Sequence, residues 1–298
     1  MSELAEQMIP ADKDPLEVAV APVRKKRKTK FGFLFWFFVA WIGLTIVASI
    51  AAPWIGLQNP NNGNFSSLNQ GPSTAHWFGT DDLGRDILSR VIYGSRVSLI
   101  VGFGAMFIAM LIGGTLGMVA AYRRGAVDTF VSAASYVMLA FPALVAVIAI
   151  VAFWGHELWK ITIIVGIASI PLVYRVVRAA TLSYATREFV TAAKAQGASD
   201  TRILIKELLP NVLPAMISFF LIGVATVIIL EGALAFLGLS VQAPTASWGN
   251  MIAESRTYLQ QNPWLALFPS MAMFLFLIAL NLVGDVLRQA LDVQDAKL

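Results

Sequence analysis

The sequence contains no cysteine and only two histidines among its 298 residues. The absence of cysteine excludes disulfide bonds and thiolate metal ligands. Charged residues make up only 13% of the chain, whereas a soluble globular domain has about a quarter. The pair His156-Glu157 begins like a zinc-protease helix, but Lys160 stands where the second histidine is required. A metalloprotease is therefore excluded.

Sequence patterns of nucleotide hydrolysis and serine hydrolysis are also missing. No G-x-x-x-x-G-K-[ST] stretch occurs, so the chain has no loop of that type to hold nucleotide phosphates. No ordering of serine, histidine and aspartate indicates a hydrolase. We therefore expect no catalytic residue in this chain.

Long apolar runs are what the sequence has in abundance. Hydrophobic residues form 57% of the chain, and the mean hydropathy is +0.71. A bilayer core of about 30 Å needs about 20 helical residues. The predicted spans are 33–52, 97–121, 129–153, a fourth from residue 161, a fifth from about residue 212, and 264–284. The expected fold class is an all-α integral membrane protein with six transmembrane helices.

Two prolines and two arginines modify the third and fourth spans. Pro142 and Pro171 are expected to break them, because proline removes a helical hydrogen bond. Arg175 interrupts the fourth run after 14 uncharged residues. We expect Arg175 and Arg178 to reach towards lipid headgroups while the helix continues into water.

The basic residues orient the chain. A basic run from Arg24 to Lys30 precedes the first apolar run, which at 20 residues suits a retained anchor better than a cleaved signal. We interpret this run as a topology signal at the lipid surface and not as a nucleic-acid patch. With both termini in the cytoplasm, 17 of the 22 lysines and arginines lie inside. This topology also places residues 187–211, "REFVTAAKAQGASDTRILIKELLPN", in the cytoplasm.

Acidic and basic residues alternate in the outer segment before the second span. Asp81 to Arg85 and Asp86 to Arg90 are both spaced at i,i+4 with the acid first. The pattern predicts an amphipathic helix on the outer surface, with Leu83, Ile87 and Val91 towards the membrane. A metal site is not expected, because the arginines compete for the carboxylates.

The polar segment (residues 187–211) is predicted to form two short helices. Residues 188–196 tolerate a helix, and Glu188 suits its positive end. Gly197 is placed to close that helix in the left-handed conformation. Ser199 is a suitable N-cap for a second short helix, which Pro210 would end before the fifth span. The small residues between them favour close docking of a partner, although an amphipathic connector on the membrane surface remains open.

The polar segment resembles the EAA loop of binding-protein-dependent ABC importer permeases. The likeness rests on the spacing of Ala192, Ala193, Gly197, Leu209 and Pro210. Two positions differ, since Thr191 replaces the glutamate of the family name and Glu207 replaces a usual isoleucine.

Three further stretches resemble the C-type subunit of the dipeptide/oligopeptide subfamily, in which threonine at the position of Thr191 is common. They are "FGTDDLGRDILSRVIYGSRVSLIVG" (78–102), "ILEGALAFLGLSVQAPTASWGNMI" (229–252) and "NLVGDVLRQALD" (281–292). Together the likeness covers residues 78–292.

The resemblance implies a type I ABC importer permease fold. The implied divisions are a cytoplasmic basic tail (1–32), a first transmembrane helix (33–52), an extracytoplasmic segment with the amphipathic helix (53–96), a permease core of five transmembrane helices with the coupling loop 187–211 (97–286), and a cytoplasmic C-terminal tail (287–298). The implied contacts with the ATPase are Glu188, Thr191, Ala192, Ala193, Gly197, Ser199, Leu209 and Pro210.

The resemblance also implies the other members of the assembly. These are a homologous second permease of the B type, two ATPase subunits or an ATPase homodimer, and an extracytoplasmic solute-binding protein. ATP and magnesium are expected on the ATPases, with no cofactor and no metal on this chain. The substrate would be a di- or oligopeptide, and the location the bacterial inner membrane. An ion-coupled secondary transporter and a membrane scaffold subunit are the alternatives.

Glu231 is the one acidic residue deep in the fifth apolar run. A charged group at a helix centre costs about 2.5–3.5 kcal/mol on insertion scales. Three roles remain open from the sequence: a group on the translocation pathway, a contact with the partner permease, and a side chain that reaches the outer interface.

Overall fold

The computed structural model describes residues 32–295, and side chains up to residue 290. The predicted basic tail lies outside the described residues, except for Gly32. All regular elements within 32–295 are helices. The principal ones are α3 (Phe33–Ala51), α4 (Ile87–Ala109), α5 (Thr115–Arg123), α6 (Gly125–Ala140), α7 (Ala143–Trp154), α8 (Leu158–Ala185), α9 (Glu188–Ala195), α10 (Asp200–Arg202), α11 (Leu209–Phe236), α12 (Trp248–Ser255) and α13 (Trp264–Asp295).

The predicted apolar spans are largely confirmed. Five helices of the described residues are long and apolar enough to cross a membrane, and the bent pair α6–α7 makes six if it is counted as one span. The π-helical turn η2 (Met110–Gly114) joins α4 and α5 into one helix from Ile87 to Arg123. That helix begins ten residues before the predicted span 97–121. At the other end of the chain α13 continues to Asp295, so helix extends into the predicted C-terminal tail.

The two prolines behave differently. At Pro142 the predicted span 129–153 breaks into α6 and α7, which meet at a bend of 82°. Phe141 is extended there, because the residue before a proline avoids the helical region. The predicted break at Pro171 is wrong, since α8 runs through this proline from Leu158 to Ala185. Pro171 is buried, and packing around it keeps the chain helical.

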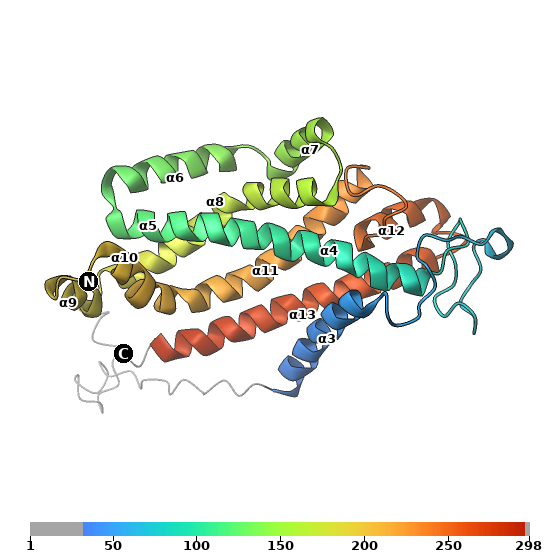
Figure 1. Ribbon diagram of the computed structural model, residues 1–298, viewed down its shortest axis with the longest axis horizontal. Coiled ribbons are helices and arrows are strands. Elements are labelled where there is room, and N and C mark those ends of the chain that lie inside the picture. Colours follow the sequence, from blue (N-terminus) through green and yellow to red (C-terminus); the bar gives the residue numbers. More distant parts are fainter. Residues whose placement is uncertain (1–31, 296–298) are drawn as a thin grey trace, which may run out of the picture.

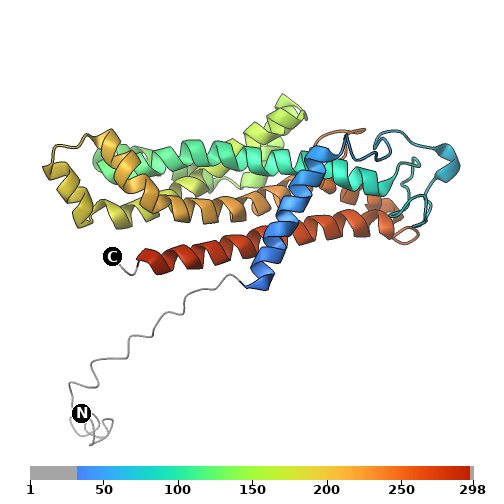
Figure 2. The ribbon, with the colours of Figure 1, turned by 60° about the horizontal axis from the view of Figure 1, so that its bottom comes forward.

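The helices form a bundle along one long axis (Figure 1). The segments α4–α5, α8, α11 and α13 run along this axis and enclose an apolar core, in which Val101, Val165 and Ile228 are fully buried. The helices α9 and α10 lie at one end, and α12 with the loops before α4 lies at the other. Figure 2 shows α3 crossing the bundle at a steep angle. This helix buries only Ser49 of its 19 residues.

Glycines on α4–α5 let α8 approach closely. A Cβ atom added at Gly113 would lie 2.7 Å from the carbonyl oxygen of Ile170, and one added at Gly117 would lie 2.9 Å from that of Tyr174. Both contacts are with backbone, so no side chain can move aside. These small residues therefore pack α4–α5 and α8 into one unit.

The two arginines of α8 also differ in their surroundings. Arg175 is exposed, and its contact with lipid headgroups stays a prediction. The prediction for Arg178 is wrong, because its guanidinium group is held by Asp128 of α6 through two short hydrogen bonds. A carboxylate at the start of α6 offers this guanidinium better hydrogen-bonding geometry than lipid headgroups would.

Candidate functional site

The first turn of the polar segment confirms the local sequence signals. The helix α9 begins at Glu188, and Gly197 adopts a positive φ of 77°. The amides of Gly197 and Ala198 donate to the carbonyls of Lys194 and Ala193 at 2.9 and 3.0 Å. These bonds close α9 in the manner of a glycine C-cap. Ser199 then caps α10, its hydroxyl accepting from the amide of Arg202 at 3.4 Å.

The predicted end of the second short helix at Pro210 is wrong. The helix α10 continues through a π-helical turn, η3 (Ile203–Leu208), into α11, so that one helix runs from Asp200 to Phe236. A proline removes one backbone donor and crowds the carbonyl one turn earlier. The wider π turn precedes Pro210 and relieves that crowding. Asn211 uses its side-chain amide to donate to the carbonyl of Glu207 at 2.6 Å.

A small apolar core of its own makes the polar segment rigid. Val190, Ile203 and Leu208 are each at most 1% exposed. Around them pack Tyr122, Tyr184, Ala185, Ala193, Ala198 and Leu204. Ala193 therefore faces inward and Ile203 is unavailable as an anchor for a partner. The outward face carries Glu188, Thr191 and Ala192, all exposed.

The end of α5 fastens the polar segment to the bundle, which the sequence reasoning did not predict. The Tyr122 hydroxyl donates to Asp200 at 3.0 Å, and the Lys194 ammonium lies 4.7 Å from the centre of the Tyr122 ring. Arg123 approaches Asp200 at 3.8 Å. Leu209, half-buried, packs against the main core, whereas Pro210 is exposed. The only sequence signal was charge, since Arg123 and Asp200 lie on the same predicted side of the membrane.

A groove opens beside α9. Its volume is about 730 Å³. The lining residues come from the end of α8, the start of α9 and the η3–α11 junction: Tyr184, Thr186, Arg187, Glu188, Phe189, Glu207 and Asn211. Two carboxylates and one guanidinium border it, so this end of the molecule presents a shaped surface of mixed charge next to the outward face of α9.

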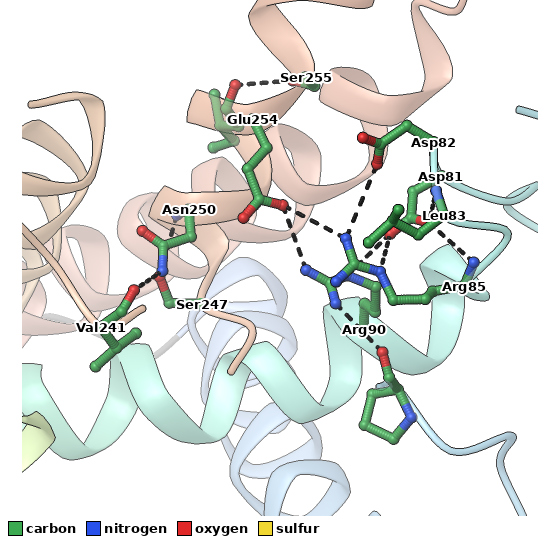
Figure 3. Close-up of polar contacts among 12 residues, drawn as sticks. Asp81, Asp82, Leu83, Arg85, Arg90, Val241, Ser247, Asn250, Glu254 and Ser255 are labelled. Atoms are coloured by element: carbon green, nitrogen blue, oxygen red, sulfur yellow. Dashed lines mark hydrogen bonds and ion pairs between the residues drawn. The ribbon is translucent and has the colours of Figure 1, made fainter. Parts of the chain in front are cut away.

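The opposite end is organised by a charged cluster of Asp81, Asp82, Arg85, Arg90 and Glu254 (Figure 3). Arg90 is 1% exposed, and its guanidinium lies 3.4 Å from both Asp81 and Glu254. It also donates to the carbonyl of Pro60 at 3.2 Å. Arg85 contacts Asp81 at 2.6 Å and Glu254 at 3.8 Å. The cluster therefore ties the loops before α4 to α12.

Electrostatics within the charged cluster act on Glu254 in two directions. Burial against neighbouring groups raises the pKa of the Glu254 carboxyl. The positive charges of Arg90 and Arg85 oppose this rise in pKa. Both guanidinium groups thus favour the charged form of Glu254.

The predicted amphipathic helix at the charged cluster is wrong for residues 81–86. Asp81 closes a turn by accepting from the amides of Leu83 and Arg85, and Gly84 has a φ of 73°. Asp86 is the N-cap of α4, accepting from the amide of Ser89 at 2.8 Å, and does not pair with Arg90. Aspartate and glycine favour turns and caps over helix interiors, and this preference outweighs the i,i+4 charge pattern. Ile87 and Val91 pack into the bundle core.

Glu231 lies within the fold and not on an open surface. The residue is 1% exposed, and its Oε1 atom accepts from the hydroxyls of Ser240 and Ser247 at 2.5 and 2.8 Å. The chain itself thus encloses the carboxyl group. The loop after α11 folds back over it, and the pathway, partner-contact and outer-interface roles of Glu231 stay predictions. The sequence alone did not signal this loop contact.

The packing around Trp248 gives a structural reason for the tryptophan and glycine in the stretch 229–252. Trp248 is 1% exposed and donates from its indole nitrogen to the carbonyl of Val91 at 3.0 Å. Next to it, a Cβ atom at Gly249 would lie 2.7 Å from the Cα of Gly232 and 3.1 Å from Glu231. A large anchor and a close backbone contact therefore seat α12 on α11.

The Gly249→Ala substitution is expected to destabilise the protein by about 1–3 kcal/mol, because the added methyl group overpacks a backbone contact. The apparent melting temperature of the purified protein in detergent measures this. Gly43→Ala in α3 is the matched control, since no atom lies within 4 Å of the added group. Equal melting of the Gly249→Ala variant and the wild type would contradict the packing argument.

Comparison with known proteins gives consistent matches. Residues 113–293 match the family described as binding-protein-dependent transport system inner membrane component. The chain is 42% identical over 259 residues to the dipeptide transport system permease protein DppC of Alkalihalophilus pseudofirmus, covering 85% of each chain. It is 40% identical over 255 residues to the glutathione transport system permease protein GsiD of Pectobacterium atrosepticum, covering 84% of this chain and 85% of that one.

A solved structure shares the fold. The match is a chain of the MetNI methionine ABC transporter in an inward-facing conformation, with a TM-score of 0.59 and 18% sequence identity. It covers 69% of this chain and 97% of that one. At this identity the likeness concerns the fold alone.

Proposed function

Because the chain belongs to the family of inner membrane components of binding-protein-dependent transport systems, we propose that it is the C-type permease subunit of an ATP-driven importer of di- or oligopeptides. It is a multi-pass protein of the bacterial inner membrane with the type I ABC importer permease fold. Permease subunits of this kind have no ATPase site of their own. Family membership favours this function over an ion-coupled secondary transporter or a membrane scaffold.

The proposed substrate class rests on the named relatives. One is a dipeptide permease and another a glutathione permease, and glutathione is itself a short peptide. Short peptides with a free carboxylate are the chemistry common to both. In the proposed assembly, this chain and a homologous B-type permease form the pathway together, and a solute-binding protein delivers the peptide at the end that carries the charged cluster.

The proposed ATPase subunits bind at the end of the molecule that carries the polar segment. Both termini and the polar segment face the cytoplasm, where two ATPase subunits, or a homodimer, bind ATP and magnesium. The observation that carries this proposal is the rigid polar segment. Its own apolar core and its bonds to α5 allow it to transmit a movement of the ATPases to the bundle without unfolding.

We assign separate tasks to the residues of the polar segment. Glu188, Thr191 and Ala192 form the exposed docking face on α9. Ala193 belongs to the inner core, Gly197 and Ser199 shape the turn, and Leu209 and Pro210 join the segment to α11. The residues that the family resemblance implies for ATPase contact thus divide into a contacting and a supporting group.

The test is a tryptophan substitution on the docking face. Ala192→Trp is expected to lower ATP-dependent uptake of a labelled dipeptide more than ten-fold in reconstituted complexes, which corresponds to at least about 1.4 kcal/mol of lost docking. Co-purification with the ATPase subunits should fall with it, while the chain still inserts in the membrane. The reason is that a large side chain prevents close approach of a partner to α9.

Two variants serve as controls. Ala192→Ser keeps the residue small and should transport like the wild type. Ala193→Trp points inward, so it should disturb the polar segment itself, which limited proteolysis of residues 187–211 detects. Normal ATPase binding and uptake by Ala192→Trp would exclude the docking role of this face, and uptake by the wild type without ATP would exclude the importer.

A further inference from the structure

The bent arm formed by α6 and α7 (residues 125–154) is weakly packed at its base. Of the 16 residues of α6, all of them described, only Ser135 is buried. Large apolar side chains such as Phe130, Tyr136 and Val137 are more than 60% exposed. Apolar packing within the chain therefore contributes little to holding α6 against the bundle.

A polar clamp holds the base of the arm to α8. Arg178 donates from Nε and Nη2 to the two carboxylate oxygens of Asp128 at 2.5 and 2.6 Å, a bidentate pair. Tyr174 donates to Asp128 at 3.3 Å, and its hydroxyl lies 2.8 Å from that of Ser132. The Asp128 side chain is 17% exposed and the Arg178 side chain 30% exposed. Bidentate geometry and partial burial make this pair stronger and more directional than a surface ion pair.

Arg178 lies on the helix that leads directly into the polar segment. The helix α8 ends at Ala185 and α9 begins at Glu188. The short connection is itself hydrogen-bonded, since the amide of Arg187 donates to the carbonyl of Tyr184 at 3.0 Å. A displacement of α9 therefore also displaces α8, because the connection between them is short and hydrogen-bonded.

We propose that the Asp128–Arg178 pair makes the α6–α7 arm follow α8, and so transmits movement of the polar segment to the arm during transport. Both residues are positioning residues, since they act through the arm. The proposal rests on the proposed function. The clamp attaches α6 to α8, because the largely exposed α6 has little apolar packing of its own against the bundle.

Removing one charge should uncouple hydrolysis from uptake. With Asp128→Asn in the reconstituted complex, we expect the amount of labelled dipeptide taken up per ATP hydrolysed to fall at least five-fold, while basal ATP hydrolysis is retained. The exchange Asp128→Arg with Arg178→Asp should recover most of this ratio. Glu157→Gln, which removes the 2.8 Å pair with Lys160 at the other end of α8, is the matched control and should leave the ratio unchanged.

The ratio separates coupling from folding. A purely structural role would lower uptake and hydrolysis together, leaving the ratio of Asp128→Asn at the wild-type value, and this would overturn the proposal. If Asp128→Asn does not assemble, Arg178→Lys keeps the charge but loses the bidentate fork, and it should lower the same ratio. A normal ratio in Arg178→Lys would also overturn the proposal.

A direct readout does not depend on transport. Because the chain has no cysteine, spin labels can be placed cleanly at Phe130→Cys on α6 and Leu172→Cys on α8, both exposed. We expect a narrow distance distribution in the otherwise unchanged chain and a broad one with Asp128→Asn. Equal distributions would refute the clamp. Failure of wild-type uptake would contradict the proposed function, while this measurement would still decide the clamp.

Discussion

Trp248→Ala is expected to destabilise the protein by about 3–5 kcal/mol, the cost typical of removing a buried tryptophan. The side chain is almost fully enclosed between α4, α11 and α13. Its ring meets Phe276 edge-on at 5.6 Å, and its backbone amide donates to Ser98 at 3.2 Å. Truncation would leave a cavity and remove the indole donor to the carbonyl of Val91. The apparent melting temperature in detergent measures the loss.

Two further variants separate the contribution of the Trp248 hydrogen bond from that of its buried ring and provide a control. Trp248→Phe keeps a ring but removes the indole hydrogen bond to Val91, so it should cost about 1–3 kcal/mol. Trp54→Ala removes a tryptophan that is 78% exposed and should leave the melting temperature unchanged. A wild-type melting temperature for Trp248→Ala would show that α12 is not anchored through this residue.

Arg90→Ala should cost about 1.5–3 kcal/mol, because it removes a buried, charged hydrogen-bond donor from the cluster. The guanidinium is the centre of the charged cluster, with contacts to Asp81, Glu254 and the Pro60 carbonyl. Without it, the loops before α4 keep only the longer contact of Arg85 with Glu254 in this cluster as a link to α12. We expect faster proteolysis of residues 53–86 together with a lower melting temperature.

Arg96→Ala is the matched control for Arg90→Ala, since it removes an exposed arginine from the same helix. The double variant Arg90→Ala with Glu254→Ala should be less destabilised than the sum of the two single variants, because each single variant already removes the contact between these two residues. Strict additivity would mean that Arg90 and Glu254 do not interact.

Features set by neighbours in the sequence were predictable. The spans followed from apolar runs, and the turn at Gly197 and the cap at Ser199 followed from backbone preferences that act over a few residues. Local rules failed where two of them compete. At residues 81–86, turn-forming aspartates and glycines outweighed an i,i+4 charge pattern, and at Pro210 a preceding π turn removed the crowding that normally ends a helix.

Contacts between distant residues were not predictable. Asp128 and Arg178 are separated by 50 positions, and the sequence pattern placed Arg178 at the lipid headgroups and gave Asp128 no role. The surroundings of Glu231 stayed open among three roles, because nothing in an apolar run indicates that a later loop will bring Ser240 and Ser247 over it. These positions depend on how the helices pack, which the apolar pattern leaves open.

One helix, from Asp200 to Phe236 with the π turn η3 within it, connects the two ends of the molecule. Its 37 residues span about 55 Å at 1.5 Å per residue. One end is part of the polar segment, and the other carries Glu231, whose serines hold the loop leading to α12. A tilt of about 5° over that length displaces one end relative to the other by about 5 Å. An ATPase that moves the end with the polar segment would thus also shift the loops at the opposite end through this helix.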